Sequence, residues 1–416
     1  MKILWITNIL FPEAEQLLTG SGEMKASGGW MLGAANALLK NEDIELYVAT
    51  VSTKVRNLIQ LEGKSITYFV LPMGKGNQDF NNEYCTYWMQ VKNVVNPDIV
   101  HIHGTEYSHG LAYMKVCGSD NVVISIQGLT SAYYYYYYGM TKSDIYRNIT
   151  LRDLLKGSVI HGKKLFARRA KYEIEMLKMV KHVIGRTSWD RSRVWAINPD
   201  AQYHFCNETL RSEFYNGDKW NYENCEKHSI FLSQAGYPIK GLHQVLKAMP
   251  FILGHYPETK IRIAGGDITK SSTISEKLRL SGYGKYIKKI INEMGLEGKV
   301  TFTGNLNGEQ MKQEYLRANV FVCPSSIENS PNSLGEAQIL GTPCVASYVG
   351  GVMDMMKGNE NNLYRFEEIE MLAEKVCHVF KNEDKQVDMH VVAAERHSPN
   401  KNATNLLLIY KNITNC

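Results

Sequence analysis

Residues 320–356 read V-F-V-C-P-S-S-I-E-N-S-P-N-S-L-G-E-A-Q-I-L-G-T-P-C-V-A-S-Y-V-G-G-V-M-D-M-M. The β-branched start of this stretch predicts a buried parallel strand over 320–322. A polar loop follows, an apolar pattern then predicts a helix over 336–340, and residues 344–346 begin the next strand. Strand, loop, helix and strand in this order are the repeating unit of a parallel α/β sheet.

Two glutamates, Glu328 and Glu336, flank the loop of this unit, and the residues between them, 329–335, are mostly small or turn-forming. A loop between a strand and a helix directs backbone N–H groups and the positive end of the helix toward one place, which suits a phosphate. The two carboxylates can then accept hydrogen bonds from hydroxyls beside that phosphate. This combination describes a nucleotide-sugar site; the alternative is an ordinary strand–helix turn with two solvated acids.

The stretch resembles the donor-site signature of the retaining glycosyltransferases of family 4, which have the GT-B fold. The similarity also includes Pro324-Ser325, Gly341-Thr342-Pro343 and Gly350-Gly351. The resemblance implies that Glu328 contacts the transferred sugar and that Glu336 binds the nucleotide ribose.

Three backbone amides of the same loop are implied to hold the diphosphate of the donor: those of Asn332, Ser333 and Leu334. Family members usually add an arginine and a lysine from a second loop, which here follows the strand predicted over 229–233. Lys240 matches the lysine, but the arginine is absent. Its loss matters because charge-assisted hydrogen bonds are about twice as strong as neutral ones. Arg186, after the strand predicted over 182–185, is the candidate replacement.

Glycines mark three further places for a donor. Gly28 and Gly29 open a predicted helix, where a ligand can approach the backbone, although a tight turn explains such a pair equally well. The pair matches the N-terminal glycine loop of the family, which reaches the donor phosphate. Gly265 follows the strand predicted over 260–264, and Gly304 follows another strand in a loop that the resemblance places near the base.

Strands are also predicted through the first half of the chain, with helical stretches between most of them. Their ranges are 3–7, 45–50, 66–71, 98–103, 122–127 and 182–185. This alternation predicts a doubly wound parallel sheet, in which ligands lie beyond the carboxyl ends of the strands.

Two polar residues occupy such carboxyl ends. His103 shares a face with His101 and is either a buried, hydrogen-bonded histidine or a contact to acceptor or sugar. No third ligand has a suitable spacing, so a metal site is not expected. Gln127 stands where many family members have a histidine that touches the transferred sugar, and its amide can hydrogen-bond a hydroxyl. The predicted catalytic set is therefore His103, Gln127, Lys240 and Glu328.

Six successive tyrosines occupy residues 133–138, and the stretch 156–181 that follows is basic, with Glu173 and Glu175 as its acids. Neither a helix nor a strand can bury all six rings, so some must meet solvent, a partner or a membrane interface. Together these segments predict peripheral contact with an anionic membrane surface. The alternative, favoured after Glu173, is a solvated helix packed on the sheet. No recognised motif supports nucleic-acid binding.

Composition places the chain among soluble globular proteins. Its 416 residues are enough for two domains, and its hydrophobic content of 44% and charged content of 21% are ordinary. The eight cysteines include no C-x-x-C pair, so reduced thiols are expected. No apolar run approaches the ~18 residues that a spanning helix needs. We therefore expect a cytoplasmic protein, located at the inner face of the cytoplasmic membrane where the predicted contact forms.

The resemblance implies two facing Rossmann-like, doubly wound parallel-sheet domains with a cleft between them. The predicted acceptor-binding domain covers residues 1–215 and the predicted donor-binding domain covers residues 229–390. A polar segment over 216–228 is expected to link them, and residues 391–416 are expected to cross back to the first domain.

The expected reaction moves a sugar from a nucleotide-diphosphate sugar, taken to be a UDP-sugar, to a hydroxyl of a glycan or lipid-linked glycan in polysaccharide assembly. The resemblance implies retention at the anomeric carbon. It also implies no metal and no cofactor besides the donor, and no Asp-x-Asp motif is present. Two alternatives stay open: epimerisation or hydrolysis of a sugar nucleotide on the same fold, and a non-catalytic scaffold that binds a nucleotide-sugar.

Overall fold

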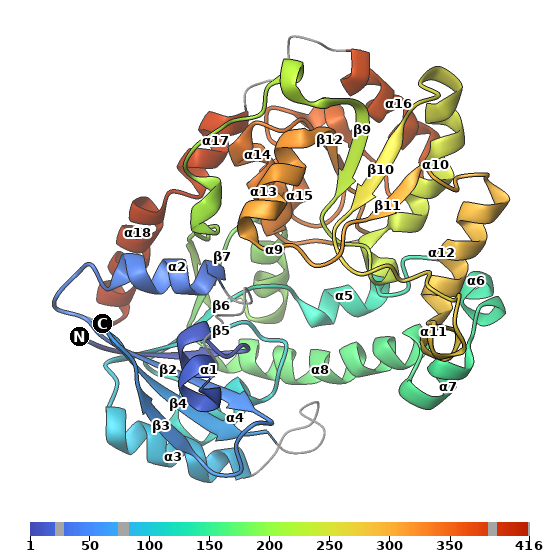
Figure 1. Ribbon diagram of the computed structural model, residues 1–416. Coiled ribbons are helices and arrows are strands. Elements are labelled where there is room, and N and C mark those ends of the chain that lie inside the picture. The colour runs from blue at the N-terminus through green and yellow to red at the C-terminus, as the bar shows by residue number, and fades with distance from the viewer. Residues whose placement is uncertain (21–28, 74–82, 382–388, 415–416) are drawn as a thin grey trace. The chain divides into compact units, whose positions relative to one another are not determined.

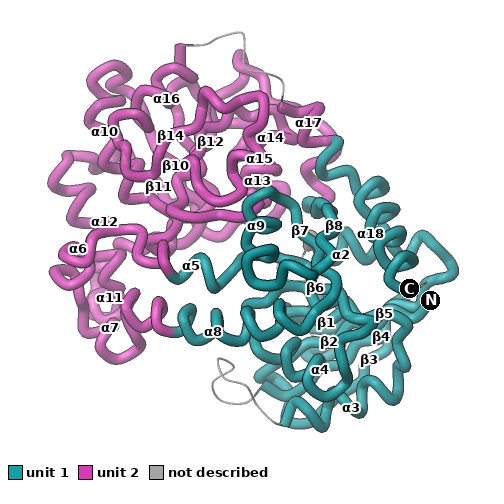
Figure 2. The backbone as a smooth tube through the Cα atoms, turned by 180° about the vertical axis from the view of Figure 1, so that it is seen from behind, with its two compact units in different colours: residues 1–134, 165–211, 395–416 teal, residues 135–164, 212–394 magenta. Residues whose placement is uncertain are grey.

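The computed structural model describes residues 1–20, 29–73, 83–381 and 389–414 (Figure 1). The chain forms two compact units (Figure 2). Unit 1 contains residues 1–134, 165–211 and 395–416, and unit 2 contains residues 135–164 and 212–394. This division differs from the predicted one at residues 135–164, which pack with the second half of the chain.

Unit 1 is built on an eight-stranded sheet with the order β3-β4-β2-β1-β5-β6-β7-β8. Neighbouring strands are parallel except at β3, which pairs antiparallel with β4. The strands are β1 (Lys2–Thr7), β2 (Glu45–Ser52), β3 (Ile59–Glu62), β4 (Ile66–Pro72), β5 (Ile99–His103), β6 (Val122–Ser125), β7 (His182–Gly185) and β8 (Gln202–Phe205). The antiparallel strand β3 was not predicted, because it has only four residues and exposes two of them at the edge of the sheet.

Helices cover both faces of this sheet, as the predicted doubly wound arrangement requires. One face is covered by helices that include α3 and α4, which contribute Trp88 and Tyr113 to the core. The other is covered by helices that include α2 and α18, which contribute Met31 and Tyr410. The helices are α1 (Pro12–Thr19), α2 (Gly29–Leu38), α3 (Glu83–Val95), α4 (His109–Cys117), α5 (Thr130–Tyr136), α8 (Val159–Met179), α9 (Ser188–Ile197) and α18 (Pro399–Thr414).

Unit 2 has a six-stranded parallel sheet with the order β11-β10-β9-β12-β13-β14. Its strands are β9 (Glu226–Leu232), β10 (Lys260–Ile263), β11 (Val300–Phe302), β12 (Ala318–Cys323), β13 (Cys344–Ser347) and β14 (Leu363–Tyr364). Its helices are α6 (Lys142–Arg147), α7 (Leu151–Lys156), α10 (Leu242–His255), α11 (Ile274–Arg279), α12 (Gly282–Glu293), α13 (Gly308–Arg317), α14 (Asn332–Leu340), α15 (Val352–Met355), α16 (Ile369–Lys381) and α17 (Met389–Arg396). The apolar core of this unit includes Ile230, Val320 and Val345 from three neighbouring strands.

Two segments differ from their predicted roles. The linker predicted over 216–228 is fastened to unit 2, because Trp220 donates from its indole Nε1 to the Ala318 carbonyl at 2.7 Å and strand β9 already begins at Glu226. Helix α14 begins at Asn332, four residues before the predicted start, because the small polar residues after Pro331 form its first turn instead of a loop. Among the described helices, none is both long enough and apolar enough to cross a membrane.

Candidate functional site

Lys240 and Glu328 form a largely buried ion pair in unit 2. Lys240 ends a short 3-10 turn after β9, and Glu328 lies in the loop between β12 and α14. Lys240 Nζ donates to Glu328 Oε1 at 2.5 Å, and the Ser325 hydroxyl donates to the same oxygen at 2.7 Å. Because β9 and β12 are neighbouring parallel strands, the loops at their carboxyl ends meet at one edge of the sheet.

This ion pair keeps the ammonium group of Lys240 charged although it is largely buried. Burial alone would lower the pKa of Lys240, but the carboxylate of Glu328 raises that pKa above its ordinary value. Lys240 is therefore charged at neutral pH. An ammonium carries three N–H donors, so a diphosphate can bind beside the carboxylate without removing Glu328 from its partner.

The N-terminus of α14 adds backbone donors to the same loop. The first N–H groups of a helix have no acceptor within that helix, and the helix dipole makes this end positive. Asn332 and Ser333 are the first two residues of α14. The predicted contribution of Leu334 needs correction, because its N–H already donates to the Pro331 carbonyl at 3.0 Å.

Glu336 belongs to the same helix and lies 5% exposed within unit 2. The hydroxyl of Tyr315, on α13, donates to its Oε2 at 3.2 Å. Tyr315 was not predicted at this site, because it comes from a different helix and no local pattern connects the two residues. The contact of Glu336 with a ribose stays a prediction.

Glycines shape the rest of this edge. Gly265 and Gly304 pair with each other through N–H···O bonds of 2.9 and 3.1 Å, and both have positive φ. A Cβ added at either position would meet no described atom within 4 Å, so a ligand can approach both backbones closely. Gly350 and Gly351 lie against the loop of Glu328, and the Gly351 N–H donates to the Glu328 carbonyl at 3.0 Å.

The end of the tyrosine run packs against the turn Pro238–Lys240, which we call the lysine turn. The carbonyl of Gly139 accepts from His243 Nε2 at 2.7 Å, and the carbonyl of Tyr136 accepts from the Ser326 hydroxyl at 3.1 Å. A Cβ at Gly139 would lie 2.5 Å from the Pro238 carbonyl oxygen, so this backbone packs directly against the turn that ends in Lys240. These contacts explain why residues 135–164 belong to unit 2.

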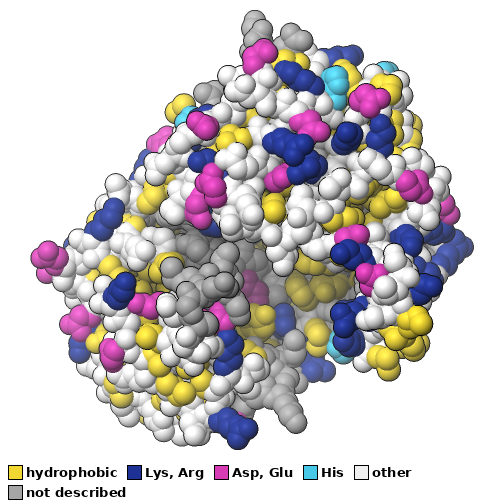
Figure 3. All heavy atoms as spheres, viewed as in Figure 1, with side chains coloured by type: hydrophobic (Ala, Val, Ile, Leu, Met, Phe, Trp, Pro, Cys, Tyr) yellow, Lys and Arg dark blue, Asp and Glu magenta, His cyan; other side chains and the backbone are white. Residues whose placement is uncertain are grey.

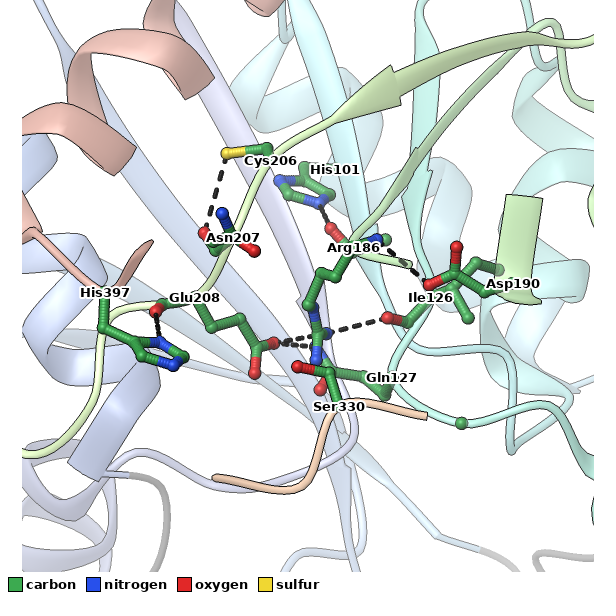
Figure 4. Close-up of polar contacts among 12 residues, drawn as sticks. His101, Ile126, Gln127, Arg186, Asp190, Cys206, Asn207, Glu208, Ser330 and His397 are labelled. Atoms are coloured by element: carbon green, nitrogen blue, oxygen red, sulfur yellow. Dashed lines mark hydrogen bonds and ion pairs between the residues drawn. The ribbon is translucent and has the colours of Figure 1, made fainter. Parts of the chain in front are cut away.

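Unit 1 holds a second polar cluster, at the carboxyl ends of β6, β7 and β8 (Figure 4). Arg186 forms an ion pair with Glu208 at 2.5 Å and donates to the Ile126 carbonyl at 2.7 Å. Gln127 Nε2 donates to the same Glu208 oxygen at 2.8 Å. The charge of Arg186 is therefore balanced within unit 1, and its role as the replacement diphosphate arginine stays a prediction.

His101 and His103 stack with ring centroids 3.7 Å apart, which confirms that they share a face. His101 is buried and hydrogen-bonded to Tyr410 and to Ser125. Burial and the nearby Arg186 lower the pKa of His103 to about 3, so its ring is neutral at physiological pH. With Arg186 and Glu208, both histidines line a cavity of about 50 Å³.

Glu106 is an acid of unit 1 with a raised pKa, and it was not assigned a role from the sequence. Its Oε2 accepts from Asn8 Nδ2 at 2.7 Å and its Oε1 from the Gly128 N–H at 3.3 Å. Burial, reinforced by the charge of Glu173, raises its pKa to about 7, against the opposing effects of its hydrogen bonds and Arg186. The raised pKa of Glu106 could not be predicted from the sequence, because it depends on burial and on Glu173, which comes from α8.

We expect Glu106→Gln to remove a pH-dependent term from stability. A raised folded-state pKa means that the folded protein holds a proton which the unfolded chain releases, so stability falls as pH rises from 4.5 to about 7. The free energy of unfolding of the variant, relative to the original protein, should therefore increase across this window by roughly 2 kcal/mol. Urea unfolding at several pH values measures the difference in free energy of unfolding between the two proteins. The contributions of the histidines cancel in this difference, because both proteins contain the same histidines. A difference independent of pH would contradict the assignment.

The structure gives no geometry for one of the two glycines predicted to open a helix at the donor site. Gly28 lies outside the described residues, and Gly29 is the first residue of α2. Within residues 1–20, 29–73, 83–381 and 389–414, no three His, Cys, Asp or Glu side chains gather as metal ligands.

Residues 219–407 match the model of the Glycosyl transferases group 1 family. The matched segment includes the Lys240–Glu328 pair and the start of α14. A curated relative, an uncharacterized glycosyltransferase of Methanocaldococcus jannaschii, is 33% identical over 140 residues, which are 33% of this chain and 32% of that protein. The match thus spans about a third of the relative's length.

Solved structures resemble the whole chain. Sucrose-phosphate synthase from Thermosynechococcus elongatus aligns with a TM-score of 0.64 at 14% identity, over 100% of this chain and 96% of that one. HepE of Anabaena, solved in complex with UDP, aligns with a TM-score of 0.64 at 13% identity, over 99% and 100% of the two chains. The predicted fold class is confirmed: both units are parallel-sheet α/β domains of the GT-B fold.

Proposed function

We propose that this protein is a retaining glycosyltransferase of family 4 that moves a sugar from a UDP-sugar to a hydroxyl of a glycan or lipid-linked glycan in polysaccharide assembly. The observation that carries the proposal is the meeting of Lys240, Glu328 and the N-terminus of α14 at one sheet edge. A cation, a carboxylate and free amides at one place match a diphosphate joined to a sugar.

In this proposal the chain's own groups stabilise the leaving diphosphate. Lys240 and the amides of Asn332 and Ser333 face the charge that grows on the leaving oxygen, so no metal is required of them. Glu328 accepts hydrogen bonds from the sugar. The departing phosphate takes the proton of the acceptor hydroxyl, which attacks from the same face. Gln127 and His103 contribute hydrogen bonds rather than proton transfer, since a primary amide and a neutral, buried imidazole are poor acids.

UDP as the donor nucleotide is supported by the Anabaena protein, which was solved with UDP. Melting temperatures measured with UDP, GDP, ADP, CDP and TDP test this choice. A ligand at a hundred times its dissociation constant adds ~2.7 kcal/mol to stability, which is easily detected. We expect a shift with UDP that Glu336→Gln reduces. A shift with another nucleotide would replace UDP, and no shift with any would favour a scaffold without donor binding.

Product analysis tests the reaction class. Donor and a lipid-linked or free glycan acceptor should together give a glycoside whose anomeric configuration, read by NMR, equals that of the donor. Donor alone should give neither an epimer nor rapid release of free sugar. Accumulation of either product without an acceptor would favour epimerisation or hydrolysis.

The proposed acceptor class and the location at an inner membrane face were inferred from residues 133–138 and 156–181. The structure reduces the number of tyrosine rings that could reach a membrane. Tyr133 packs on the core of unit 1, and Tyr135 and Tyr136 are the most exposed rings of the run. Glu173 is fully buried, and Met176 and Leu177 join the core, as the alternative of a helix packed on the sheet requires. Direct membrane contact by the whole run therefore does not fit these rings.

A further inference from the structure

Unit 2 exposes a group of large apolar side chains on two short helices that pack side by side, α7 and α11 (Figures 1 and 2). Leu154 and Leu155 on α7 are 73% and 77% exposed, and Ile274 on α11 is 78% exposed. Leu151 and Leu278 on the same helices are each more than half exposed. We call these five residues the α7–α11 surface. Contiguous exposed apolar groups of this kind usually mark an interaction site.

Basic side chains surround the α7–α11 surface. The exposed lysines and arginines on and beside the two helices are Lys142, Arg147, Lys156, Lys270, Lys277 and Arg279. In Figure 3, yellow apolar and dark blue basic spheres lie together at the lower right, where Figure 1 places α7 and α11.

The acids of this region are occupied by local structure. Asp153 is buried, caps the start of α7 and accepts from the Gly282 N–H at 2.8 Å. Glu276 completes the capping box of α11. The carboxylate of Asp144 accepts from the hydroxyl of Thr141, the N-cap of α6, at 2.7 Å and from the Tyr286 hydroxyl at 3.3 Å. The charge that faces outward beside the leucines is therefore predominantly positive.

These same contacts fix the surface on unit 2. Asp153 joins α7 to the first turn of α12, and Asp144 joins α6 to the middle of α12. A Cβ at Gly282 would lie 2.8 Å from the Asn148 carbonyl oxygen, so the two segments are in close contact. The leucines are thus presented on a packed support and need no folding step to become available.

We propose that the α7–α11 surface docks unit 2 on an anionic lipid bilayer. Leucine and isoleucine side chains enter the boundary between head groups and acyl chains, while the surrounding lysines and arginines attract anionic head groups. A protein partner would need acidic and apolar groups in a matching shape, whereas an anionic bilayer supplies both everywhere. This docking depends on the exposed side chains alone and holds whether or not the protein transfers a sugar.

The α7–α11 surface is a better candidate for membrane contact than the tyrosine run of residues 133–138. Tyr137 packs over Gly162, and Tyr138 lies 4.4 Å from Lys163 Nζ, so both rings are engaged within unit 2. The leucines of α7 have no comparable cover among the described residues, to judge from their exposure.

Sedimentation with lipid vesicles tests the proposal on the full chain. We expect binding to vesicles of equal parts phosphatidylcholine and phosphatidylglycerol, and little binding to phosphatidylcholine alone. Leu154→Ser/Leu155→Ser should weaken the partition by about tenfold or more, since both lost side chains are apolar and exposed. Lys277→Glu/Arg279→Glu should weaken binding to anionic vesicles and reduce its dependence on salt, since four of the six basic side chains remain.

The matched control is Val391→Ser/Val392→Ser on α17 of the same unit, where the two valines are 65% and 41% exposed. It should bind as the original protein does, and unchanged melting temperatures would show that all variants are folded. Equal binding by the leucine variant, or no binding by the original protein, would overturn the proposal. A dimer in sedimentation velocity that the leucine variant dissociates, without vesicle binding, would assign the surface to a second copy of this chain instead.

Discussion

Replacing Lys240 by methionine is expected to lower the rate of sugar transfer by about a hundredfold or more, the cost of removing one preorganised donor from a developing negative charge. Methionine keeps an unbranched chain of similar length and removes the charge. Steady-state rates at saturating donor give the loss in kcat, and calorimetry with UDP gives the loss in affinity. If the ammonium stabilises the leaving group, kcat should fall more than donor affinity does.

The same substitution leaves the carboxylate of Glu328 without its cation, which costs on the order of 3 kcal/mol in a buried pair. Stability and activity must therefore be separated. Lys240→Met/Glu328→Gln should recover much of the stability, because the uncompensated charge is gone, and should recover no activity. Lys289→Met, at an exposed lysine of α12, is the control and should change neither quantity. Recovered transfer in the double variant would mean that the ion pair is only structural.

Alanine at Gly241 is expected to destabilise unit 2 and to abolish nucleotide binding. Gly241 has a φ of +73°, and a Cβ there would lie 1.7 Å from the carbonyl oxygen of Pro324. Because that oxygen belongs to the backbone, the clash moves either the lysine turn or the loop that carries Glu328. The combined strain and overpacking should cost about 3 kcal/mol or more. Urea unfolding measures this cost, and titration with UDP measures the loss of binding.

Gly341→Ala separates the strain of a positive φ from the steric clash of an added Cβ. Gly341 has a φ of +81°, similar to that of Gly241, but an added Cβ would meet no described atom within 4 Å. This variant should therefore show the conformational strain alone, about 1 kcal/mol, and retain nucleotide binding. If both glycine variants behaved alike, the close approach of Gly241 to Pro324 would not matter for the site.

Much of the fold could be predicted because the signals are local. The strand at residues 320–322 and the strand at residues 182–185 show their β-branched runs directly, and β7 has the predicted limits. The ion pair between Glu328 and Lys240 was not predicted, because the resemblance implied a separate donor contact for each residue. Boundaries were less accurate, as at α14, because residues that favour turns also favour the first turn of a helix.

The sequence by itself determined the class of the fold and placed Glu328 and Lys240 in loops that follow strands, since each of these features depends on consecutive residues. The tertiary structure decided three other matters. It placed residues 135–164 on unit 2, paired Arg186 with Glu208, and gathered the exposed leucine and isoleucine side chains of α7 and α11. Periodicity reports which face of an element is apolar, but the partner of that face is set by packing between residues far apart in the chain.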